Sequence, residues 1–237
     1  MSRFQRLLAS SIGAKVGMAV TGILLSFFVV GHLMGNLLVY QGRQAVNDYA
    51  AFLKGLGPWL WVVRAGLLGV FVLHIVLAIQ LKRRNQAART VGYAKDHVNV
   101  ATFASRYMVL TGLCIAAFVL LHLAHFTLGW IDPTSHAVTE KVIQGGVEIE
   151  RHDVYAMVVA GFRQPVYVAI YVAAMVLLGL HLFHGLQSLF QTLGVRHPGY
   201  TPTIVRACRL AAIALSAGYI SIPVGVLLGL TGAEGAS

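Results

Sequence analysis

Five stretches of the chain are apolar over a length that approaches or exceeds the roughly 20 residues that a transmembrane helix needs. They cover about 16–40, 58–81, 107–130, 165–189 and 203–230. Of the 237 residues, 57 % are hydrophobic and only 11 % are charged, which leaves little sequence for a second domain. We therefore predict an all-α integral membrane bundle of five transmembrane helices that forms a single domain over 1–237.

The charged residues predict how these helices are oriented. If five helices alternate across the membrane, 12 of the 18 lysine and arginine residues fall on the same side. The positive-inside rule places that side, together with the N-terminus, in the cytoplasm. The longest loop, 131–164, falls on the other side and carries five of the eight acidic residues. Topology thus explains the net charge of +10, and we expect no nucleic-acid partner.

The segments between the spans suggest some further structure. The loop 41–57 contains NDYAAFLKGLG, which we expect to form a short interfacial helix, and 131–164 is expected to form a cap outside the membrane. Within the last span, Pro223 predicts a kink. The two cysteines show neither C-x-x-C nor C-x-x-C-H spacing, which argues against covalently attached haem and against a thiolate metal cluster. No internal repeat is evident.

Histidines inside the apolar spans are the second strong signal. The six are His32, His74, His122, His125, His181 and His184. An ionisable side chain at membrane depth is costly, and by default it faces the bundle interior as a functional candidate. Taken singly, each could be a neutral imidazole bonded to a carbonyl or hydroxyl group, but their presence on each of four helices favours a shared function. The fifth span has none, so we expect a four-helix core with the fifth helix beside it.

Depth sorts four of these histidines into two pairs. At about 1.5 Å of rise per residue, His32 and His122 lie about 6 and 5 Å past the middles of spans one and three, which both run outward. By the same count, His74 and His181 lie about 7 and 6 Å past the middles of spans two and four, which run inward. We expect the first pair in the outer half of the membrane and the second pair in the inner half.

Two stacked imidazole pairs match the needs of two b-type haems. Neutral imidazole nitrogens bind haem iron axially, and two such ligands leave no open position, which favours electron transfer. Bundle interiors commonly hold such cofactors. His125 and His184 each follow a ligand candidate by three residues and lie on roughly the same helix face. Spacing alone does not choose between His122 and His125, or between His181 and His184.

Basic residues near the helix ends are candidate partners for the anionic haem propionates. The candidates are Arg64 and Arg163 near the outer ends and Lys82 and Arg106 near the inner ends. Each could instead be an interfacial residue whose charged head extends to the membrane surface. Glycines beside the histidines, such as Gly31 and Gly35 around His32, could allow close helix packing or leave room for a flat macrocycle.

Taken together, the histidine-containing segments resemble a known family. They read SSIGAKVGMAVTG leading into GHLMGN, LHIVLAIQLKRRNQAAR, RYMVLTG followed by LHLAHFTLG, and GLHLFHGLQSLFQTLG. These segments look like the di-haem cytochrome b anchor of bacterial succinate:menaquinone oxidoreductases and quinol:fumarate reductases. The resemblance covers all five spans, and it implies that the domain over 1–237 is a membrane anchor.

The resemblance also implies which histidines bind the haems. Carried over position by position, the axial ligands of the family fall on His32 and His122 for the outer haem and on His74 and His181 for the inner haem. This is the pairing that the depth count gives independently. The resemblance therefore favours His122 and His181 over the histidine that follows each of them by three residues.

The resemblance implies partners and an activity as well. A soluble flavoprotein subunit oxidises succinate, or reduces fumarate, in the cytoplasm, and an iron–sulfur subunit passes electrons to the anchor. The two haem b groups link that subunit to a membrane quinone, which we expect to be menaquinone. The chain would thus be a subunit of complex II (succinate dehydrogenase) in the cytoplasmic membrane of a bacterium, surrounded by membrane lipid, with the dicarboxylate site on a partner. A higher oligomer of the whole complex is left open.

The basic inner face with Arg83, Arg84 and Arg89 suits docking of the partner, although the positive-inside rule alone explains the charge.

Quinone contacts are predicted at both ends of the bundle. Ser11 and Lys15 in SIGAK resemble the Ser-x-x-x-Arg of quinone-binding anchors in related enzymes, with lysine in place of arginine, and interfacial anchoring is the alternative. Outside, where some family members use a glutamate, the polar candidates are Gln44, Asn47 and Asp48. Some members also carry a proton-transferring glutamate at the position of Gly179, so that route is not expected in this chain.

Two other functions fit part of the pattern. A haem b subunit of a hydrogenase or formate dehydrogenase would also carry membrane histidines. The quinol:cytochrome c reductase arrangement, with two ligands on each of two helices, is disfavoured because no matching histidine pair occurs within a span. A proton-coupled transporter could use the histidines as a relay, but it predicts no haem and leaves the paired depths unexplained.

Overall fold

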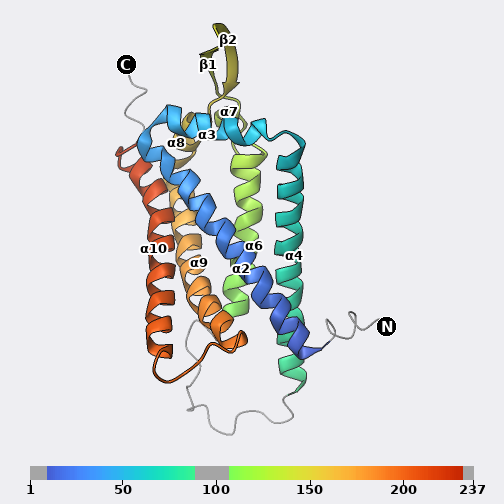
Figure 1. The fold of residues 1–237 in the computed structure, drawn as a ribbon. Coiled ribbons are helices and arrows are strands. Elements are labelled where there is room, and N and C mark those ends of the chain that lie inside the picture. The colour runs from blue at the N-terminus through green and yellow to red at the C-terminus, as the bar shows by residue number, and fades with distance from the viewer. Residues whose placement is uncertain (1–9, 89–106, 232–237) are drawn as a thin grey trace. The chain divides into compact units, whose positions relative to one another are not determined.

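Five long helices dominate the computed structural model, which describes residues 10–88 and 107–231 (Figure 1). They are α2 (Ser11–Asn36), α4 (Pro58–Ala87), α6 (Met108–His122), α9 (Pro165–Thr192) and α10 (Thr201–Leu227). A 3₁₀ turn, η1 (Leu37–Gln41), extends α2, and a π-helical turn, η2 (Leu123–Thr127), extends α6. By length and composition, all five can cross a membrane. The prediction of a multi-pass, mainly helical membrane protein is confirmed.

The helix ends differ from the predicted spans because local hydrogen bonds set them. The first helix begins at Ser11 rather than at 16, since the hydroxyl of Ser10 accepts a hydrogen bond from the backbone N–H of Gly13 at 2.9 Å and caps the helix. The last span also begins earlier than expected, at Thr201, and α10 continues through Pro223 to Leu227. The predicted kink at this proline stays a prediction.

The loops contain more structure than the sequence indicated. The short helix expected in the loop 41–57 is present as α3 (Arg43–Gly55). The expected cap consists of α7 (Pro133–His136), β1 (Thr139–Gln144), β2 (Val147–His152) and α8 (Val154–Phe162). The two strands pair antiparallel, with Gln144 opposite Val147. Gly145 and Gly146 form the connection at φ angles of 60° and 81°, values that a two-residue hairpin turn requires and that glycine adopts readily.

The described chain divides into two compact units. The first unit comprises Met1–Val29, Trp61–Leu113 and Leu178–Ile213, as far as these residues are described. It contains His74 and His181, and many of its buried side chains are small, such as Ala14 and Ala212. In this unit α2 lies close to α4, since a Cβ on Gly17 would lie only 3.0 Å from Cδ1 of Leu77.

The second unit has a larger apolar core. It comprises Val30–Leu60, Cys114–Leu177 and Ala214–Ser237, again as far as these are described. Its core cluster consists of Leu33, Val39, Tyr155, Val159, Phe162, Val168, Tyr171, Ile222 and Val226. These residues come from α2, η1, α8, α9 and α10. His32, His122 and His125 belong to this unit and lie among or beside its aromatic side chains.

The buried carboxylate of Asp153 joins α3 to α8 in the second unit. Asp153 is 0 % exposed and caps α8 by accepting a hydrogen bond from the backbone N–H of Ala156 at 2.9 Å. It also accepts a bond from Asn47 Nδ2 at 2.9 Å, and its other oxygen lies 2.8 Å from a guanidinium nitrogen of Arg43. The side-chain carbonyl of Asn47 accepts the backbone N–H of Tyr155 at 3.0 Å. The cap is therefore held by buried polar bonds as well as by apolar packing.

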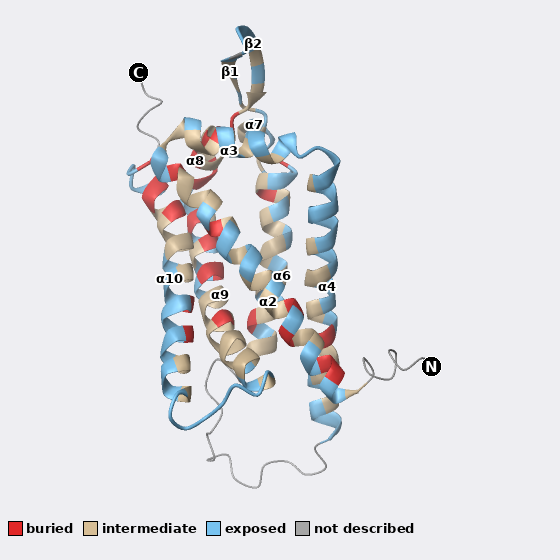
Figure 2. Ribbon diagram, viewed as in Figure 1, coloured by how far each residue is buried: buried red, intermediate tan, exposed pale blue. Residues whose placement is uncertain are grey.

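Many apolar side chains on the long helices are exposed. Figure 2 shows that most of α4 is exposed or intermediate, whereas α8 is largely buried. On α4, Trp61 and Leu68 are among the exposed large apolar residues, and Leu77 is the one buried residue. An extensive apolar surface of this kind is typical of a protein surrounded by membrane lipid.

Candidate functional site

The first unit places the ring of His74 of α4 edge-on beside the ring of His181 of α9. Their ring centroids lie 6.4 Å apart, with an angle of 63° between the ring planes. Two imidazole nitrogens that each bind one metal ion at about 2 Å place their ring centres about 6 Å apart. The spacing of this pair therefore suits one metal ion between the two rings. The paired ring is His181 rather than His184.

The hydroxyl of Thr21 determines which nitrogen of His74 carries the proton. Thr21 is 4 % exposed, and its Oγ1 donates to the backbone carbonyl of Gly17 at 2.8 Å. When the single hydroxyl proton is directed at this carbonyl, Oγ1 acts as acceptor in its 3.0 Å contact with Nδ1 of His74. The proton of His74 is thus assigned to Nδ1, which leaves the lone pair on Nε2 for a metal.

Thr111 plays the same part for His181. This threonine is 5 % exposed and donates to the carbonyl of Met108 at 3.0 Å. Its Oγ1 lies 3.3 Å from Nδ1 of His181, which we again assign as the protonated nitrogen. Hydrogen bonds of this kind orient metal-binding histidines and fix their tautomer. Both histidines of the first unit are therefore prepared to bind through Nε2.

A glycine next to each threonine lies against the imidazole ring. A Cβ on Gly22 would lie 3.6 Å from Cε1 of His74, and a Cβ on Gly112 would lie 3.3 Å from Cε1 of His181. These are not the glycines that the sequence singled out. The Cβ position of Gly31 meets no other atom within 4 Å, and Gly35 instead packs against Tyr49.

Sequence reasoning missed both threonines and both glycines, although a signal was present. The segments TGILLSFFVVGH in α2 and TGLCIAAFVLLH in α6 share the pattern T-G-x9-H. In each helix, the threonine and glycine support a histidine of the first unit, and the histidine that ends the pattern belongs to the second unit. The two helices therefore share a spacing pattern that the sequence analysis did not note.

The second unit places His32 of α2 beside His122 of α6. Their ring centroids are 5.9 Å apart, with 78° between the planes. The ring of Tyr219 lies 6.2 Å from that of His32, and Phe118 stacks on His122 at 6.0 Å. The separation again suits one metal ion between two imidazoles, and the surrounding rings are aromatic.

His125 has a different environment from His122. It is 2 % exposed and lies between the rings of Phe126 and Tyr167, at centroid distances of 4.0 and 4.4 Å. The π-helical turn η2 begins directly after His122 and contains His125. Such turns change the direction of side chains within a helix and are frequent at functional sites. Of these two histidines, His122 makes the ring contact with His32.

Three of the predicted propionate partners lie at the surface. Arg64 is exposed and lies over the ring of Trp61, at 5.1 Å from its centroid. Arg163 and Lys82 are also exposed. Arg106 lies outside the described residues. Long exposed side chains of this kind can turn toward a neighbouring anion or extend to the membrane surface.

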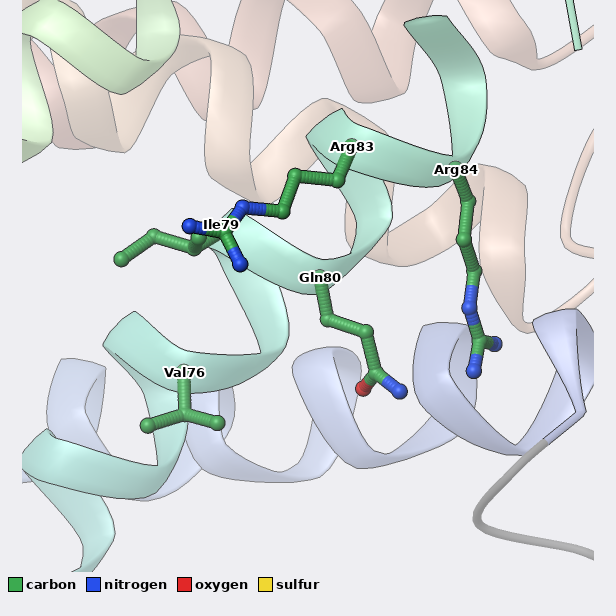
Figure 3. A pocket seen from close by; sticks show the side chains of 5 residues that line it. All are labelled: Val76, Ile79, Gln80, Arg83 and Arg84. Carbon is green, nitrogen blue, oxygen red and sulfur yellow. The ribbon is translucent and has the colours of Figure 1, made fainter. Parts of the chain in front are cut away.

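Arg84 is a basic residue that the sequence analysis did not consider for this role. Figure 3 shows a pocket along α4 that is lined by Val76, Ile79, Gln80, Arg83 and Arg84, with a volume of about 390 Å³. Gln80 and Arg84 point to the same side in this view. Within the described part of the chain, the buried Nη1 of Arg84 has no hydrogen-bond partner. This nitrogen can donate to an anionic or carbonyl oxygen.

The quinone candidates fall into two groups. Ser11 and Lys15 are exposed in the first turns of α2. Asn47 uses both ends of its amide to hold the cap, and Asp48 forms an ion pair with Arg151 at 2.8 Å. Asn47 and Asp48 therefore serve the fold of the cap in this structure, while Gln44 is exposed.

Comparison of the chain with family models, with curated proteins and with solved structures gives no match.

Proposed function

We propose that the chain is the di-haem b membrane-anchor subunit of a succinate:menaquinone oxidoreductase or of a quinol:fumarate reductase. In this role it passes electrons between an iron–sulfur subunit and a membrane quinone, menaquinone. The dicarboxylate site lies on the flavoprotein partner in the cytoplasm. The N-terminus of the chain lies on the same side of a bacterial cytoplasmic membrane.

One observation carries the proposal. Two histidine pairs have ring centroids 6.4 and 5.9 Å apart, and three of the four rings contact a hydroxyl oxygen through Nδ1. Two imidazoles make up half of a tetrahedral metal site, so a pair alone suits a metal whose remaining ligands come from a macrocycle. The residues present therefore fit two haem b groups.

Haem supplies one-electron transfer when it is bound. His74 and His181 would hold the iron of the inner haem, and His32 and His122 would hold that of the outer haem. With two imidazoles as ligands, each iron would have no position left for oxygen, which would favour electron transfer over oxygen chemistry. The hydroxyl groups of Thr21 and Thr111 orient the inner pair.

Charged and polar residues would serve the remaining groups. Arg64 and Arg163 are the proposed propionate partners of the outer haem, and Lys82 and Arg106 those of the inner haem. We add Arg84 to the inner group because its buried Nη1 lacks a partner among the described residues. Ser11 and Lys15 are proposed to contact quinone. The basic end of α4, with Arg83 and Arg84, suits docking of the iron–sulfur subunit.

The test begins with a visible spectrum of the purified protein. We expect reduced b-type bands and two haems per chain by haem quantification. No haem, or one haem per chain, would contradict the proposal, and the first of these outcomes would favour a histidine proton relay. Copurification with a flavoprotein and an iron–sulfur protein then separates this complex from hydrogenases and formate dehydrogenases, which would bring other partners.

A further inference from the structure

The hydroxyl of Tyr171 lies between two imidazoles in the second unit. It is 3.3 Å from Nδ1 of His122 and 3.2 Å from Nδ1 of His125. Tyr171 is buried in the apolar core, and its ring packs edge-on against Phe118 and Phe162 at 4.9 Å each. The phenol is therefore held in place by its ring, and its oxygen is free to serve both histidines.

The single proton of a phenol limits what this arrangement can do. Tyr171 can donate to one imidazole nitrogen while it accepts from the other. If it donates to His122, then Nδ1 of His122 holds a lone pair and Nε2 carries the proton, which blocks iron binding through Nε2. If it donates to His125, then His122 carries its proton on Nδ1 and presents a lone pair on Nε2. The direction of one hydrogen bond thus decides whether His122 can bind iron.

We infer that Tyr171 is the positioning residue of the outer histidine pair: it accepts the Nδ1 proton of His122 and donates its own proton to Nδ1 of His125. This inference rests on the proposed function, because it takes His122 to be a haem ligand. It assigns a role to His125 as well, as the acceptor that fixes the direction of the phenol proton.

The aromatic neighbours of His125 hold its ring in the orientation that this assignment needs. Its ring is clamped between Phe126 and Tyr167, so it is held with Nδ1 toward Tyr171. Its Nε2 is buried and has no hydrogen-bond partner within the described residues. A Cβ on Gly161 would lie 3.2 Å from this nitrogen, so the glycine leaves room for the ring edge.

The hydrogen bond to Tyr171 also has an electronic effect. An acceptor on the outer N–H of a metal-binding imidazole makes that imidazole a stronger donor to the metal. A stronger donor favours the oxidised iron, so loss of the phenol oxygen raises the midpoint potential of the outer haem. Thr21 and Thr111 would act on the ligands of the inner haem in the same way. Their hydroxyl groups donate to backbone carbonyls, however, and not to another histidine.

The first experiment replaces Tyr171→Phe in the complete complex, which keeps the ring and removes the hydroxyl. We expect two haems to be retained and the midpoint potential of the outer haem to rise. A change of about tenfold in the relative stability of the two oxidation states corresponds to about 59 mV for one electron. The low-spin ferric electron paramagnetic resonance signal of the outer haem should shift, while that of the inner haem stays constant. Tyr167→Phe is the matched control, because its ring also contacts His125, whereas the hydroxyl that contacts both imidazoles belongs to Tyr171.

The second experiment replaces His125, the last residue in the chain of hydrogen bonds that runs from His122 through Tyr171. His125→Phe removes the acceptor, which frees the proton of Tyr171 to bond Nδ1 of His122 and oppose iron binding, so the occupancy of the outer haem should fall. His125→Asn offers an amide oxygen close to the position of Nδ1 and should restore occupancy. Equal outer-haem content in these two variants would overturn the role of His125.

The two proposals fail in different ways. If the wild-type protein binds no haem, the proposed function is wrong and this inference falls with it. If wild type binds two haems, but Tyr171→Phe leaves both potentials and both resonance signals unchanged, the function stands and the inference is overturned. If Tyr171→Phe does not assemble, the comparison of His125→Phe with His125→Asn decides the question.

Discussion

The two histidine pairs have similar ring separations but are supported in different ways. In the first unit, each imidazole contacts a threonine of a neighbouring helix, and the threonine proton ends on a carbonyl of its own helix. In the second unit, His122 contacts a tyrosine that also contacts His125, inside a cluster of aromatic rings. Both pairs thus depend on hydrogen bonds between helices that are far apart in the sequence. They differ in whether the hydroxyl group also contacts a carbonyl of its own helix or a second histidine.

This contrast teaches where each site is vulnerable. The supports of His74 and His181 lie next to small residues, so the site is sensitive to the volume of one or two side chains. The supports of His122 include a core that extends to α8 and to the cap, where Asp153 pairs with residues of α3. A change in the cap should therefore affect the second pair before the first.

The largest expected effect is the selective loss of one haem. His74→Ala or His181→Ala should remove the inner haem, and His32→Ala or His122→Ala should remove the outer haem, because under the proposed function each pair would hold one iron. Haem quantification should fall from two to one per chain. His184→Ala is the control and should retain both haems. Retention of both haems in any of the four ligand variants would refute that ligand assignment.

The next effect tests whether the cap supports the second pair alone. Asp153→Ala leaves the Asn47 amide and the Ala156 N–H without their buried acceptor, which should cost about 2–4 kcal/mol of stability. The outer haem should then be released at a lower temperature than the inner haem in a thermal scan of the visible spectrum. Asp48→Ala breaks an exposed ion pair and should cost less than about 1 kcal/mol. Simultaneous release of both haems would show that the units do not differ in this way.

Replacing the two threonines tests the hydrogen bonds of the first unit without changing its packing. Thr111→Val and Thr21→Val keep the side-chain shape and remove the acceptor for an imidazole N–H. We expect the midpoint potential of the inner haem to rise by up to about 59 mV, which corresponds to a change of about tenfold in the relative stability of the two oxidation states. The potential of the outer haem should not change. Redox titration of both haems measures this. A shift confined to the outer haem would reverse the pairing proposed for these residues.

A smaller effect is expected from the glycine beside each inner histidine. Gly112→Ala places a Cβ 3.3 Å from the ring of His181, so the ring must shift, at a cost of about 1 kcal/mol. Gly22→Ala places its Cβ 3.6 Å from the ring of His74, an ordinary contact, and should change little. Gly31→Ala is the control in the second unit. The inner-haem spectrum and its thermal release should rank Gly112→Ala as the most perturbed of the three variants.

The smallest effect is a pH dependence confined to the cap. Hydrogen bonds from Ser135 and Thr134 lower the pKa of Asp132 below its usual value of 3.8. A carboxyl group with a lowered pKa stabilises the folded state above its usual pKa, and this contribution is lost as the pH falls through the lowered value. Hydrogen exchange at the Ser135 amide should therefore speed up below about pH 4 relative to neighbouring amides. In Asp132→Asn this extra acceleration should be absent, and its persistence would mean that another group is responsible.

Much of the fold was predictable because its signals are local. The lengths of the apolar stretches predicted the five helices, and the depth count paired His74 with His181 and His32 with His122. In the structure the two rings of each pair are in contact. The partners of these rings were not predictable in the same way, since a threonine or tyrosine becomes a partner only when a neighbouring helix brings it within reach. Tyr171 is 49 residues from His122 in the sequence. The β-hairpin was missed because its short strands carry many charged residues.

The pattern shared by α2 and α6 bears on how such a protein could arise. A helix with the pattern T-G-x9-H serves both histidine pairs, and the next of the five long helices, α4 or α9, adds one more histidine. One gene segment for a helical hairpin, duplicated and fused, would therefore encode all four imidazoles. Ten positions before its histidine, one hairpin now has Arg64 and the other has Tyr171. The two copies would then have diverged in function at this position, with an arginine in one and a tyrosine in the other.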